Sequence, residues 1–289
     1  MKGLKVVIAS GKGGTGKTTV ATNLAIAASP PVRLLDCDVE EPNAHLFFNR
    51  TASETEIVTI PVPEVDEKLC DGCGECARFC RYNVIACYGS VPMIFAEMCH
   101  GCGGCLLVCP RKAISEIQKR IGIMDHFSSN GLSIVTGRLD VGIPTSPPLV
   151  RAVKTKIDEA ATNILDAPPG TSCPVVTTMK GADCVVLVTE PTPFGLHDLK
   201  LAVDTVLELS IPFGVVINRA GSGDDRVGKY CGERNIPLIM ELPDDRRVAE
   251  AYSRGEAAVN AIPEYRELFV LLMKKIRQMA ENSARGKKV

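Results

Sequence analysis

The 289-residue chain has no tryptophan, and aromatic residues make up only 4% of it. With so few aromatic rings, the sequence offers no platform on which single-stranded bases could stack. Lys and Arg (33) almost balance Asp and Glu (34), so the net charge of -1 gives no basic field that would attract a nucleic acid. No apolar run approaches the roughly 18–20 residues that cross a bilayer. We therefore expect no nucleic-acid partner and no stable membrane insertion.

Cysteine, in contrast, is abundant, with 13 residues. Disulfide-stapled secreted proteins are normally much shorter, and the first ten residues show no features of a secretory signal peptide. We therefore expect a reducing, cytoplasmic location, in which thiolates bind metal or carry out redox chemistry. Nine of the cysteines lie between Cys70 and Cys109. This concentration predicts an inserted domain over residues 61–119, within a discontinuous domain formed by residues 1–60 and 120–289.

Outside the insert, short apolar runs alternate with longer amphipathic stretches. Strands are expected at residues 6–9, 32–36, 132–135, 163–166, 185–189 and 214–218. Helices are expected at residues 17–28, 149–161, 196–209 and 227–234. This alternation is typical of an α/β fold with a mostly parallel sheet and helices on both faces. Ligands of such folds bind at the carboxyl ends of the strands, so polar residues that follow strands are the candidate site residues.

A phosphate-binding loop follows the first expected strand and opens the first expected helix, as its motif G-x-x-x-x-G-K-[ST] requires. Glycines let backbone N–H groups surround phosphate oxygens, and the helix start adds the positive end of its dipole. We expect Lys17 to reach the β- and γ-phosphates and Thr18 to bind Mg²⁺. The residues expected to bind the nucleotide are Gly11, Gly13, Gly14, Thr15, Gly16, Lys17, Thr18 and Thr19.

A second lysine, Lys12, lies near the start of this loop. With Lys12, the loop resembles the deviant phosphate loop of the MinD/ParA/Mrp ATPases, which are relatives of the nitrogenase iron protein. The resemblance extends over residues 1–60 and about 120–265, and it implies a Mg²⁺-dependent ATPase with the P-loop NTPase fold. In that family the extra lysine contacts nucleotide across a dimer interface. The resemblance therefore implies a homodimer in which Lys12 acts with Lys17 in catalysis.

The same resemblance implies roles for three acidic residues. Asp36 and Asp38 end the second expected strand, and Asp166 ends the fourth. Asp38 is expected to orient the attacking water, Asp36 to support the metal shell, and Asp166 to hold Mg²⁺ through water. The backbone N–H of Gly170 is expected to meet the γ-phosphate. The alternative interpretation is that each of these acids only caps the end of a strand.

Two later segments are similar to the adenine-binding part of the family. Asn218 and Arg219 follow the sixth expected strand and occupy the position that reads adenine. Pro243 and Asp244 resemble the second wall of the adenine site. Ordinary loops are the alternative for both segments.

The cysteine-rich insert contains an internal repeat with an offset of 29 positions, in which C-x-x-C-x-x-C-x-x-x-C occurs twice. The repeat looks like a bacterial two-cluster ferredoxin, a small α+β domain that binds two [4Fe-4S] clusters. The resemblance implies that the fourth cysteine of each run crosses to the other cluster, which gives one ligand set of Cys70, Cys73, Cys76 and Cys109 and another of Cys99, Cys102, Cys105 and Cys80. Arg81 stands where the family usually has proline, which removes a turn restraint but no ligand. Paired zinc sites are the alternative, although zinc prefers cysteine pairs with a longer gap.

Ferredoxin-bearing members of the MinD superfamily carry such an insert, and three functions remain open for this chain. The first is a dimeric ATPase coupled to electron transfer through two clusters, with an electron donor and acceptor as partners. The second is an iron–sulfur or metallocofactor assembly or carrier protein that uses ATP as a switch and serves a client protein. The third is a positioning ATPase with a redox-sensing ferredoxin module.

Two further expectations concern the arrangement of the chain. The insert lies between the Asp36–Asp38 strand end and the 132–135 strand, so its attachment points are expected close to the groups that sense the γ-phosphate. Near the C-terminus, Tyr265, Phe269, Leu272, Ile276 and Met279 recur at intervals of three and four residues. This stripe predicts a helix that closes the sheet, with a membrane-contacting helix as the alternative.

Overall fold

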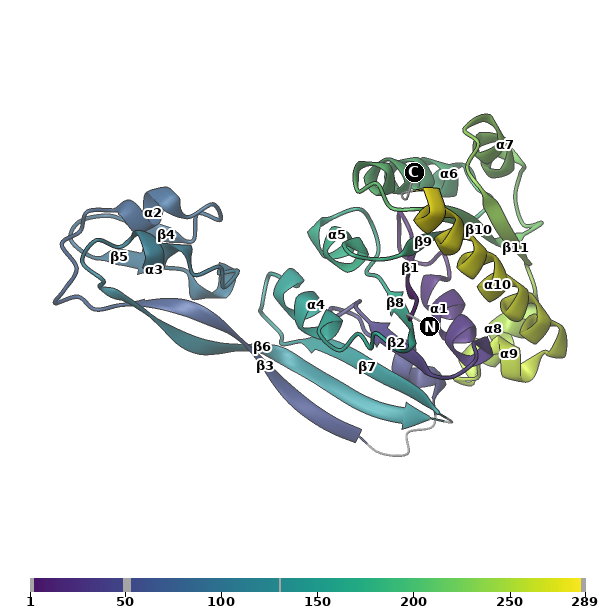
Figure 1. Ribbon diagram of the computed structural model, residues 1–289, viewed down its shortest axis with the longest axis horizontal. Coiled ribbons are helices and arrows are strands. Elements are labelled where there is room, and N and C mark those ends of the chain that lie inside the picture. Colours follow the sequence, from purple (N-terminus) through teal and green to yellow (C-terminus); the bar gives the residue numbers. More distant parts are fainter. Residues whose placement is uncertain (1–2, 49–52, 130, 287–289) are drawn as a thin grey trace.

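The computed structural model describes residues 3–48, 53–129 and 131–286 (Figure 1). Its strands are β1 (Lys5–Ala9), β2 (Val32–Asp36), β3 (Ser53–Val65), β4 (Ile85–Cys87), β5 (Pro92–Ile94), β6 (Ile114–Ser129), β7 (Leu132–Leu139), β8 (Thr162–Asp166), β9 (Cys184–Thr189), β10 (Phe213–Ala220) and β11 (Leu238–Pro243). In the described residues, nine of these form one sheet in the order β11-β10-β9-β1-β8-β2-β7-β6-β3. Neighbouring strands from β11 to β7 are parallel, whereas β6 is antiparallel to both β7 and β3.

Helices cover both faces of the sheet. The α-helices are α1 (Lys17–Ala27), α2 (Glu75–Phe79), α3 (Gly104–Val108), α4 (Pro147–Lys154), α5 (Cys173–Met179), α6 (Pro193–Glu208), α7 (Arg226–Glu233), α8 (Arg246–Ser253), α9 (Ala258–Ala261) and α10 (Pro263–Gly286), and the 3₁₀ helices are η1 (Ala44–Phe47) and η2 (Ala96–Met98). One hydrophobic core lies beneath α4 to α7, and a second lies beneath α1, α9 and α10. The observed fold is therefore the expected mostly parallel α/β sandwich.

The central strands form because they are short β-branched runs buried on both faces. Every residue of β8 and β9 is buried, and so are Val6, Val7 and Ile8 of β1. Complete burial of each such side chain contributes about 1.5–3 kcal/mol. Because parallel strands end at the same edge, this arrangement brings the segments that follow β1, β2, β8 and β10 together.

The C-terminal stripe packs as a closing helix. Tyr265, Phe269, Leu272 and Ile276 of α10 are buried in the second core, and Met279 packs against it. The prediction that this face closes the sheet is confirmed. In the part of the chain that the structure describes, no helix is long and apolar enough to span a membrane.

A long two-stranded ribbon connects this core to the cysteine-rich region. β3 and β6 pair from Ser53 with Phe127 to Val65 with Ile114, whereas β6 pairs with β7 only from Gly122 onward. The remaining length extends beyond the sheet and carries residues 66–113 at its tip (Figure 1). We call residues 66–113 the cysteine module. It contains α2, α3, η2 and the β4–β5 hairpin.

The base of the ribbon lies one strand away from β2, because β7 lies between β2 and β6 in the sheet. It is nevertheless close to Asp38, since the Val39 carbonyl accepts from the Leu139 N–H of β7 and the next N–H, that of Asp140, donates to the Ile121 carbonyl of β6. A different expectation is corrected by the structure. The helix expected at residues 149–161 ends at Lys154. The chain then turns into β8, and the side chain of Asn163 bonds the backbone of this turn, accepting from the Asp158 N–H at 2.9 Å and donating to the Ala161 carbonyl at 3.0 Å.

Candidate nucleotide site and cysteine-lined cavities

The predicted phosphate loop lies between β1 and α1, at the carboxyl edge of the sheet. The Ser10 hydroxyl donates to the Lys12 carbonyl at 2.7 Å, which closes the start of the loop. Gly14 and Gly16 have φ values of 80° and 86°, in the left-handed region that favours glycine. A cavity of about 470 Å³ opens above the loop and is lined by every residue from Lys12 to Thr19. Gly11 does not line this cavity.

Asn218 fixes the loop from the end of β10. Its side-chain amide donates to the Thr15 carbonyl at 2.8 Å across a sequence separation of 203 residues. A Cβ on Gly16 would overlap the same amide group, so glycine is required there for close approach as well as for its backbone angles. Asn218 also lines the cavity, so the residue predicted to read adenine additionally holds the phosphate loop in place.

Lys17 lies between two of the predicted acids. Its ammonium is 3.8 Å from the Asp38 carboxylate and 3.6 Å from that of Asp166, and its side chain is only 7% exposed. Burial raises the pKa of Asp38 to about 6, while Lys17 opposes this effect. Burial likewise raises the pKa of Asp166, again against the effect of Lys17. The structure therefore brings Lys17, Asp38 and Asp166 together, although Asp166 lies below the cavity wall.

Asp36 has a different set of contacts. Its carboxylate accepts hydrogen bonds from the backbone N–H groups of Asp38 at 3.2 Å, Asn43 at 3.1 Å and Ala44 at 3.0 Å. Complete burial and the nearby Asp166 raise its pKa. In this structure Asp36 orders the segment that carries Asp38, and its place in a metal shell stays a prediction.

The Gly170 backbone does not face the nucleotide cavity in this structure. Its N–H donates to the Ser10 carbonyl at 3.0 Å, and the neighbouring Ala167 N–H donates to the Ile8 carbonyl, also at 3.0 Å. Contact between Gly170 and a γ-phosphate would therefore require the segment after β8 to release its bond to Ser10.

Lys12 and Arg219 share one carboxylate. The Lys12 ammonium is 3.7 Å from Glu190, and the Arg219 guanidinium is 2.5 Å from the other oxygen of the same carboxylate. Both basic residues line the cavity. Glu190, at the end of β9, was not identified from the sequence, because a single acid after a strand is a common feature.

The far wall of the cavity comes from β11 and α8. Pro243 and Asp244, the residues predicted for the second wall of the adenine site, line it. Neighbouring residues of the wall were not identified from the sequence; they include Asp245, Val248, Ala249 and Tyr252, together with Glu41 and Asn43 near the loop. The signal for α8 was its capping residue Asp245, whose carboxylate accepts from the Arg247 N–H at 2.9 Å.

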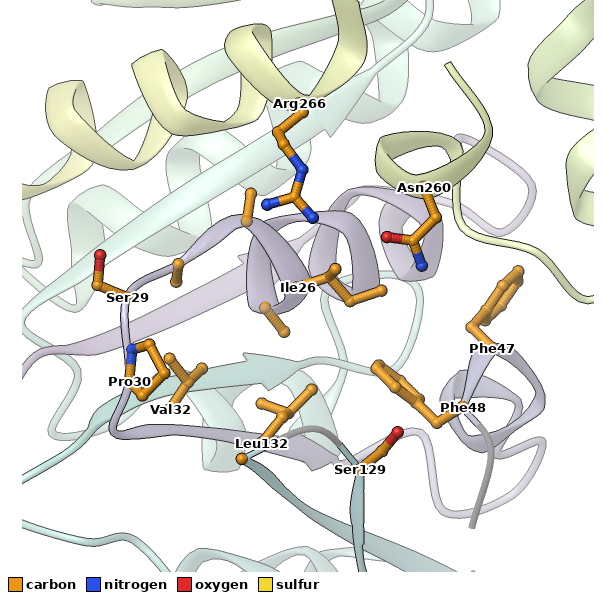
Figure 2. Close-up of a pocket in the computed structure, with 14 residues that line it drawn as sticks. Ile26, Ser29, Pro30, Val32, Phe47, Phe48, Ser129, Leu132, Asn260 and Arg266 are labelled. Atoms are coloured by element: carbon orange, nitrogen blue, oxygen red, sulfur yellow. The ribbon is translucent and has the colours of Figure 1, made fainter. Parts of the chain in front are cut away.

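A second cavity of about 470 Å³ lies at the other end of α1. Figure 2 shows it between α1, Phe47, Phe48, Asn260 and Arg266. Its lining contains none of the residues that the sequence predicted for a site.

The cysteine module contains two separate cavities. The outer one, of about 20 Å³, is lined by Cys70, Cys73, Cys76 and Cys109. The inner one, of about 190 Å³, is lined by Cys80, Cys99, Cys102 and Cys105, and also by Pro61, Pro63 and Glu116 of the ribbon. Each cavity thus collects three cysteines of one run and the fourth cysteine of the other.

Two of these sulfurs each accept a hydrogen bond from a backbone N–H group. The Gly101 N–H donates to the Cys99 Sγ at 3.4 Å, and the Ala113 N–H donates to the Cys109 Sγ at 3.3 Å. Within the described residues, no group of three or more His, Cys, Asp or Glu side chains is close enough to hold one shared metal ion. The thiols instead line the walls of cavities.

The parallel sheet and the glycine-rich loop between β1 and α1 define a P-loop nucleotide hydrolase. Residues 6–259 match the CobQ/CobB/MinD/ParA nucleotide binding domain, so the chain belongs to that family. It is a nucleotide-binding and nucleotide-hydrolysing P-loop ATPase of the MinD/ParA class.

Three similar proteins illustrate the relationship. The uncharacterised protein MJ0579 of Methanocaldococcus jannaschii is 32% identical over 269 residues, covering 87% of this chain and 90% of that protein. An iron-sulfur cluster carrier protein of Aquifex aeolicus is 27% identical, covering 97% of this chain and 69% of that protein. The crystal structure of the cell division ATPase MinD from Pyrococcus furiosus has a TM-score of 0.58 at 21% identity, covering 96% of this chain and 99% of that one, a likeness in fold.

Proposed function

We propose that this ATPase uses its nucleotide cycle to control electron transfer through two [4Fe-4S] clusters, both held by an inserted ferredoxin-like domain over residues 61–119. The observation that carries the proposal is the pair of cysteine-lined cavities in the module. Three cysteines of one run meet the fourth cysteine of the other in each cavity, which is the division of ligands that two-cluster ferredoxins use. When bound, the clusters supply one-electron redox chemistry at low potential.

The donor set of each cavity fits a cluster better than a single ion. One tetrahedral zinc ion needs four ligands about 2.3 Å from a common centre, an arrangement that no group of side chains in the described residues shows, whereas a cubane takes one thiolate at each of its irons. The N–H groups of Gly101 and Ala113 already bond to cysteine sulfurs, and such bonds tune the potential of a cluster.

In the nucleotide site, Lys17 is the cation that arriving phosphates would meet. Phosphate oxygens compete with Asp38 and Asp166 for its ammonium, which frees Asp38 to orient the attacking water. Thr18 and Asp166 would hold Mg²⁺, which supplies stabilisation of the phosphate charge. Asp166 fits this role because it is fully buried, and neither carboxylate oxygen has a hydrogen-bond partner in the described residues.

We further propose that the ATPase works as a homodimer. Lys12 lies at the mouth of the cavity with its side chain 32% exposed, and it would leave Glu190 to contact nucleotide in the partner subunit. Asn218, Arg219, Pro243 and Asp244 would bind the adenine base. The reducing cytoplasm suits the free thiols of the module.

The experiment that tests the proposal uses anaerobically purified full-length protein. We expect about eight iron atoms per chain from two cubanes and Mg²⁺-dependent ATP hydrolysis. After reduction with dithionite and removal of the excess, oxidised cytochrome c should accept electrons faster with Mg-ATP than with Mg-ADP. Equal rates in the two nucleotides would contradict control by the nucleotide cycle.

A carrier function is the second candidate, because several relatives are named for it. Besides the Aquifex protein, a cytosolic Fe-S cluster assembly factor Nubp2 homolog of Anopheles gambiae is 25% identical over 90% of this chain. If the clusters are cargo, ATP should promote loss of iron and sulfide from this protein to an apo-ferredoxin. Retention of all iron during such an incubation would exclude the carrier function. A positioning ATPase with a redox-sensing module would instead show ATP-dependent binding to a surface or partner.

A further inference from the structure

The two cysteine-lined cavities have different relations to the ATPase core. The inner cavity is lined by Pro61, Pro63 and Glu116 of the ribbon, whereas the outer cavity meets the ribbon at its tip, at Ile114. His100 lies between the inner-cavity residues Cys99 and Cys102, and its ring stacks on that of Tyr82 with centroids 3.7 Å apart. Both rings line the inner cavity. The inner cavity therefore borders the loop of residues 99–102, which we call the His100 loop and which is the part of this cavity that the core contacts.

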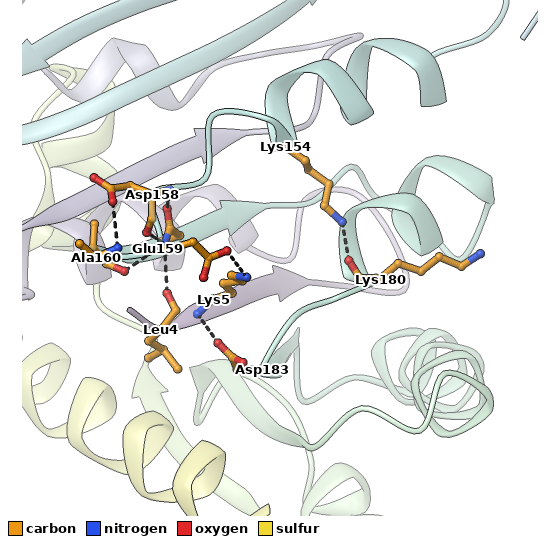
Figure 3. A network of polar contacts seen from close by, with 10 residues as sticks. Leu4, Lys5, Lys154, Asp158, Glu159, Ala160, Lys180 and Asp183 are labelled. Atoms are coloured by element: carbon orange, nitrogen blue, oxygen red, sulfur yellow. Dashed lines mark hydrogen bonds and ion pairs between the residues drawn. The ribbon is translucent and has the colours of Figure 1, made fainter. Parts of the chain in front are cut away.

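Helix α4 of the core contacts that loop directly. The Arg151 guanidinium donates to the His100 carbonyl at 3.4 Å. One turn further along α4, the Lys154 ammonium donates to three carbonyls at the end of α5, namely those of Thr177 at 2.6 Å, Thr178 at 2.9 Å and Lys180 at 2.6 Å. Figure 3 shows Lys154 reaching from α4 to this turn. Arg151 and Lys154 are three positions apart and lie on neighbouring turns of one helix.

α5 follows the segment that must move when a γ-phosphate binds. Gly170 donates to the Ser10 carbonyl in this structure, and a γ-phosphate would draw that N–H away from Ser10. The segment from Asp166 to Gly170 runs into α5 within a few residues. Because the Lys154 side chain holds the end of α5 at three carbonyls, a displacement of α5 must either move α4 or break those bonds.

The second γ-phosphate-sensing segment also reaches α4. Val39 follows Asp38, and its carbonyl accepts from the Leu139 N–H of β7 at 2.8 Å. A Cβ on Gly137 of β7 would lie 2.7 Å from both the Val39 and the Val153 side chains, so these two side chains meet over a glycine that admits no larger residue. Close packing of this kind transmits a displacement instead of absorbing it. The first sensing segment thus reaches α4 through α5, and the second reaches it through Val39.

We propose that α4 transmits the nucleotide state to the inner cluster alone, with Lys154 as the positioning residue that receives the movement of α5 and Arg151 as the one that passes it to the His100 loop. This inference rests on the proposed function and adds an asymmetry to it. The inner cluster, on Cys80, Cys99, Cys102 and Cys105, senses nucleotide, whereas the outer cluster, on the remaining set, keeps a constant environment.

Hydrogen exchange of the iron-loaded protein locates the effect. We expect the exchange of residues 99–105 to differ between Mg-ADP and a non-hydrolysable ATP analogue, and that of residues 70–76 to stay the same. Arg151→Gln should remove the difference while leaving iron content and basal hydrolysis unchanged, because Arg151 contacts neither site's ligands. Lys154→Met should do the same, and Arg226→Gln, on the opposite edge of the sheet, is the matched control that should keep the difference.

Nucleotide affinity gives a second readout, because a redox–nucleotide coupling is reciprocal. We expect the analogue to bind reduced and oxidised protein with a roughly tenfold difference in affinity, which corresponds to about 59 mV for a one-electron couple. In Arg151→Gln the difference should fall below about twofold.

Three results would overturn the inference. The first is an equal change in hydrogen exchange at residues 70–76 and 99–105, and the second is a change in exchange confined to residues 70–76. The third is a nucleotide-dependent difference in exchange that persists in both Arg151→Gln and Arg226→Gln. Protein that binds no iron or no nucleotide would overturn the proposed function itself, and these two measurements are made first.

Discussion

The ATPase core and the cysteine module differ in how completely they bury their large apolar side chains. The core places whole strands such as β8 and β9 between two layers of helices, and its large side chains include twelve that are essentially inaccessible. None of those twelve lies in the module. The module instead has two five-residue helices and three-residue strands, and it exposes large apolar side chains: Leu69, Phe79, Tyr82, Tyr88, Met93, Phe95, Met98 and Leu107.

This difference indicates what each region needs in order to fold. The core buries enough apolar surface to be stable by itself. A region as small as the module does not, and small domains of this kind normally depend on metal or disulfide cross-links. We therefore expect the core to fold without iron and the module to depend on its clusters, and the following experiments test this separation.

The largest effect is expected for Lys17→Ala. Removal of the cation from between the phosphates, Asp38 and Asp166 should lower ATP hydrolysis by about 10²–10³-fold. Iron content should remain unchanged, because the substitution lies in the core. The measurement is phosphate release alongside an iron assay, with Lys200→Ala on the surface of α6 as the control. Undiminished turnover would contradict the nucleotide site.

Removal of iron is expected to affect the module alone. Chelation under reducing conditions should accelerate hydrogen exchange of residues 70–109 by about a hundredfold, because the contacts that hold the short helices are lost with the clusters. Exchange in β1, β8 and β9 should not change. If the core strands lost protection too, the two regions would fold as one unit and the comparison would fail.

Lys12→Ala should have an intermediate effect. We expect hydrolysis to fall by about tenfold, because a positive charge that reaches the partner subunit's nucleotide is lost from the transition state. ATP binding by the monomer should stay within about threefold, as equilibrium dialysis can measure. Loss of binding with an intact dimer would show that Lys12 serves its own subunit.

The smallest effect is expected for Asn218→Ala. The lost hydrogen bond to the Thr15 carbonyl should reduce the free energy of unfolding by about 1 kcal/mol, and ATP should bind more weakly because the loop is less well held. Urea denaturation and a binding titration measure the two effects. Asn260→Ala, in the cavity at the other end of α1, should change neither.

Much of the fold and site was predictable because the signals are local. The loop from Gly11 to Thr18, the acids that end β2 and β8, and the two cysteine runs are all short patterns in which spacing alone carries the chemistry. The strands from β1 to β10 that were expected match those observed to within a few residues, apart from a longer β7. Their apolar β-branched runs predict buried parallel strands wherever they occur.

The long strands β3 and β6 were not predicted, and the reason is physical. Pro61 and Pro63 look like a break between domains, because proline cannot donate to the hydrogen bonds of a central strand. β3 is an edge strand, where proline is tolerated. The expected insert boundaries, Pro61 and Lys119, fall within this ribbon, where Pro61 pairs with Gln118.

The sequence by itself determined the residue types and spacings that bind phosphate and that arrange thiols in two runs of four. Only the tertiary structure decided which groups meet across long separations. Asn218 holds Thr15, Lys154 holds the end of α5, and Arg151 reaches the His100 loop. These contacts depend on the order of the strands and on where α4 packs on them. No local pattern specifies that order, because it follows from the burial of the whole sheet between its two helical layers.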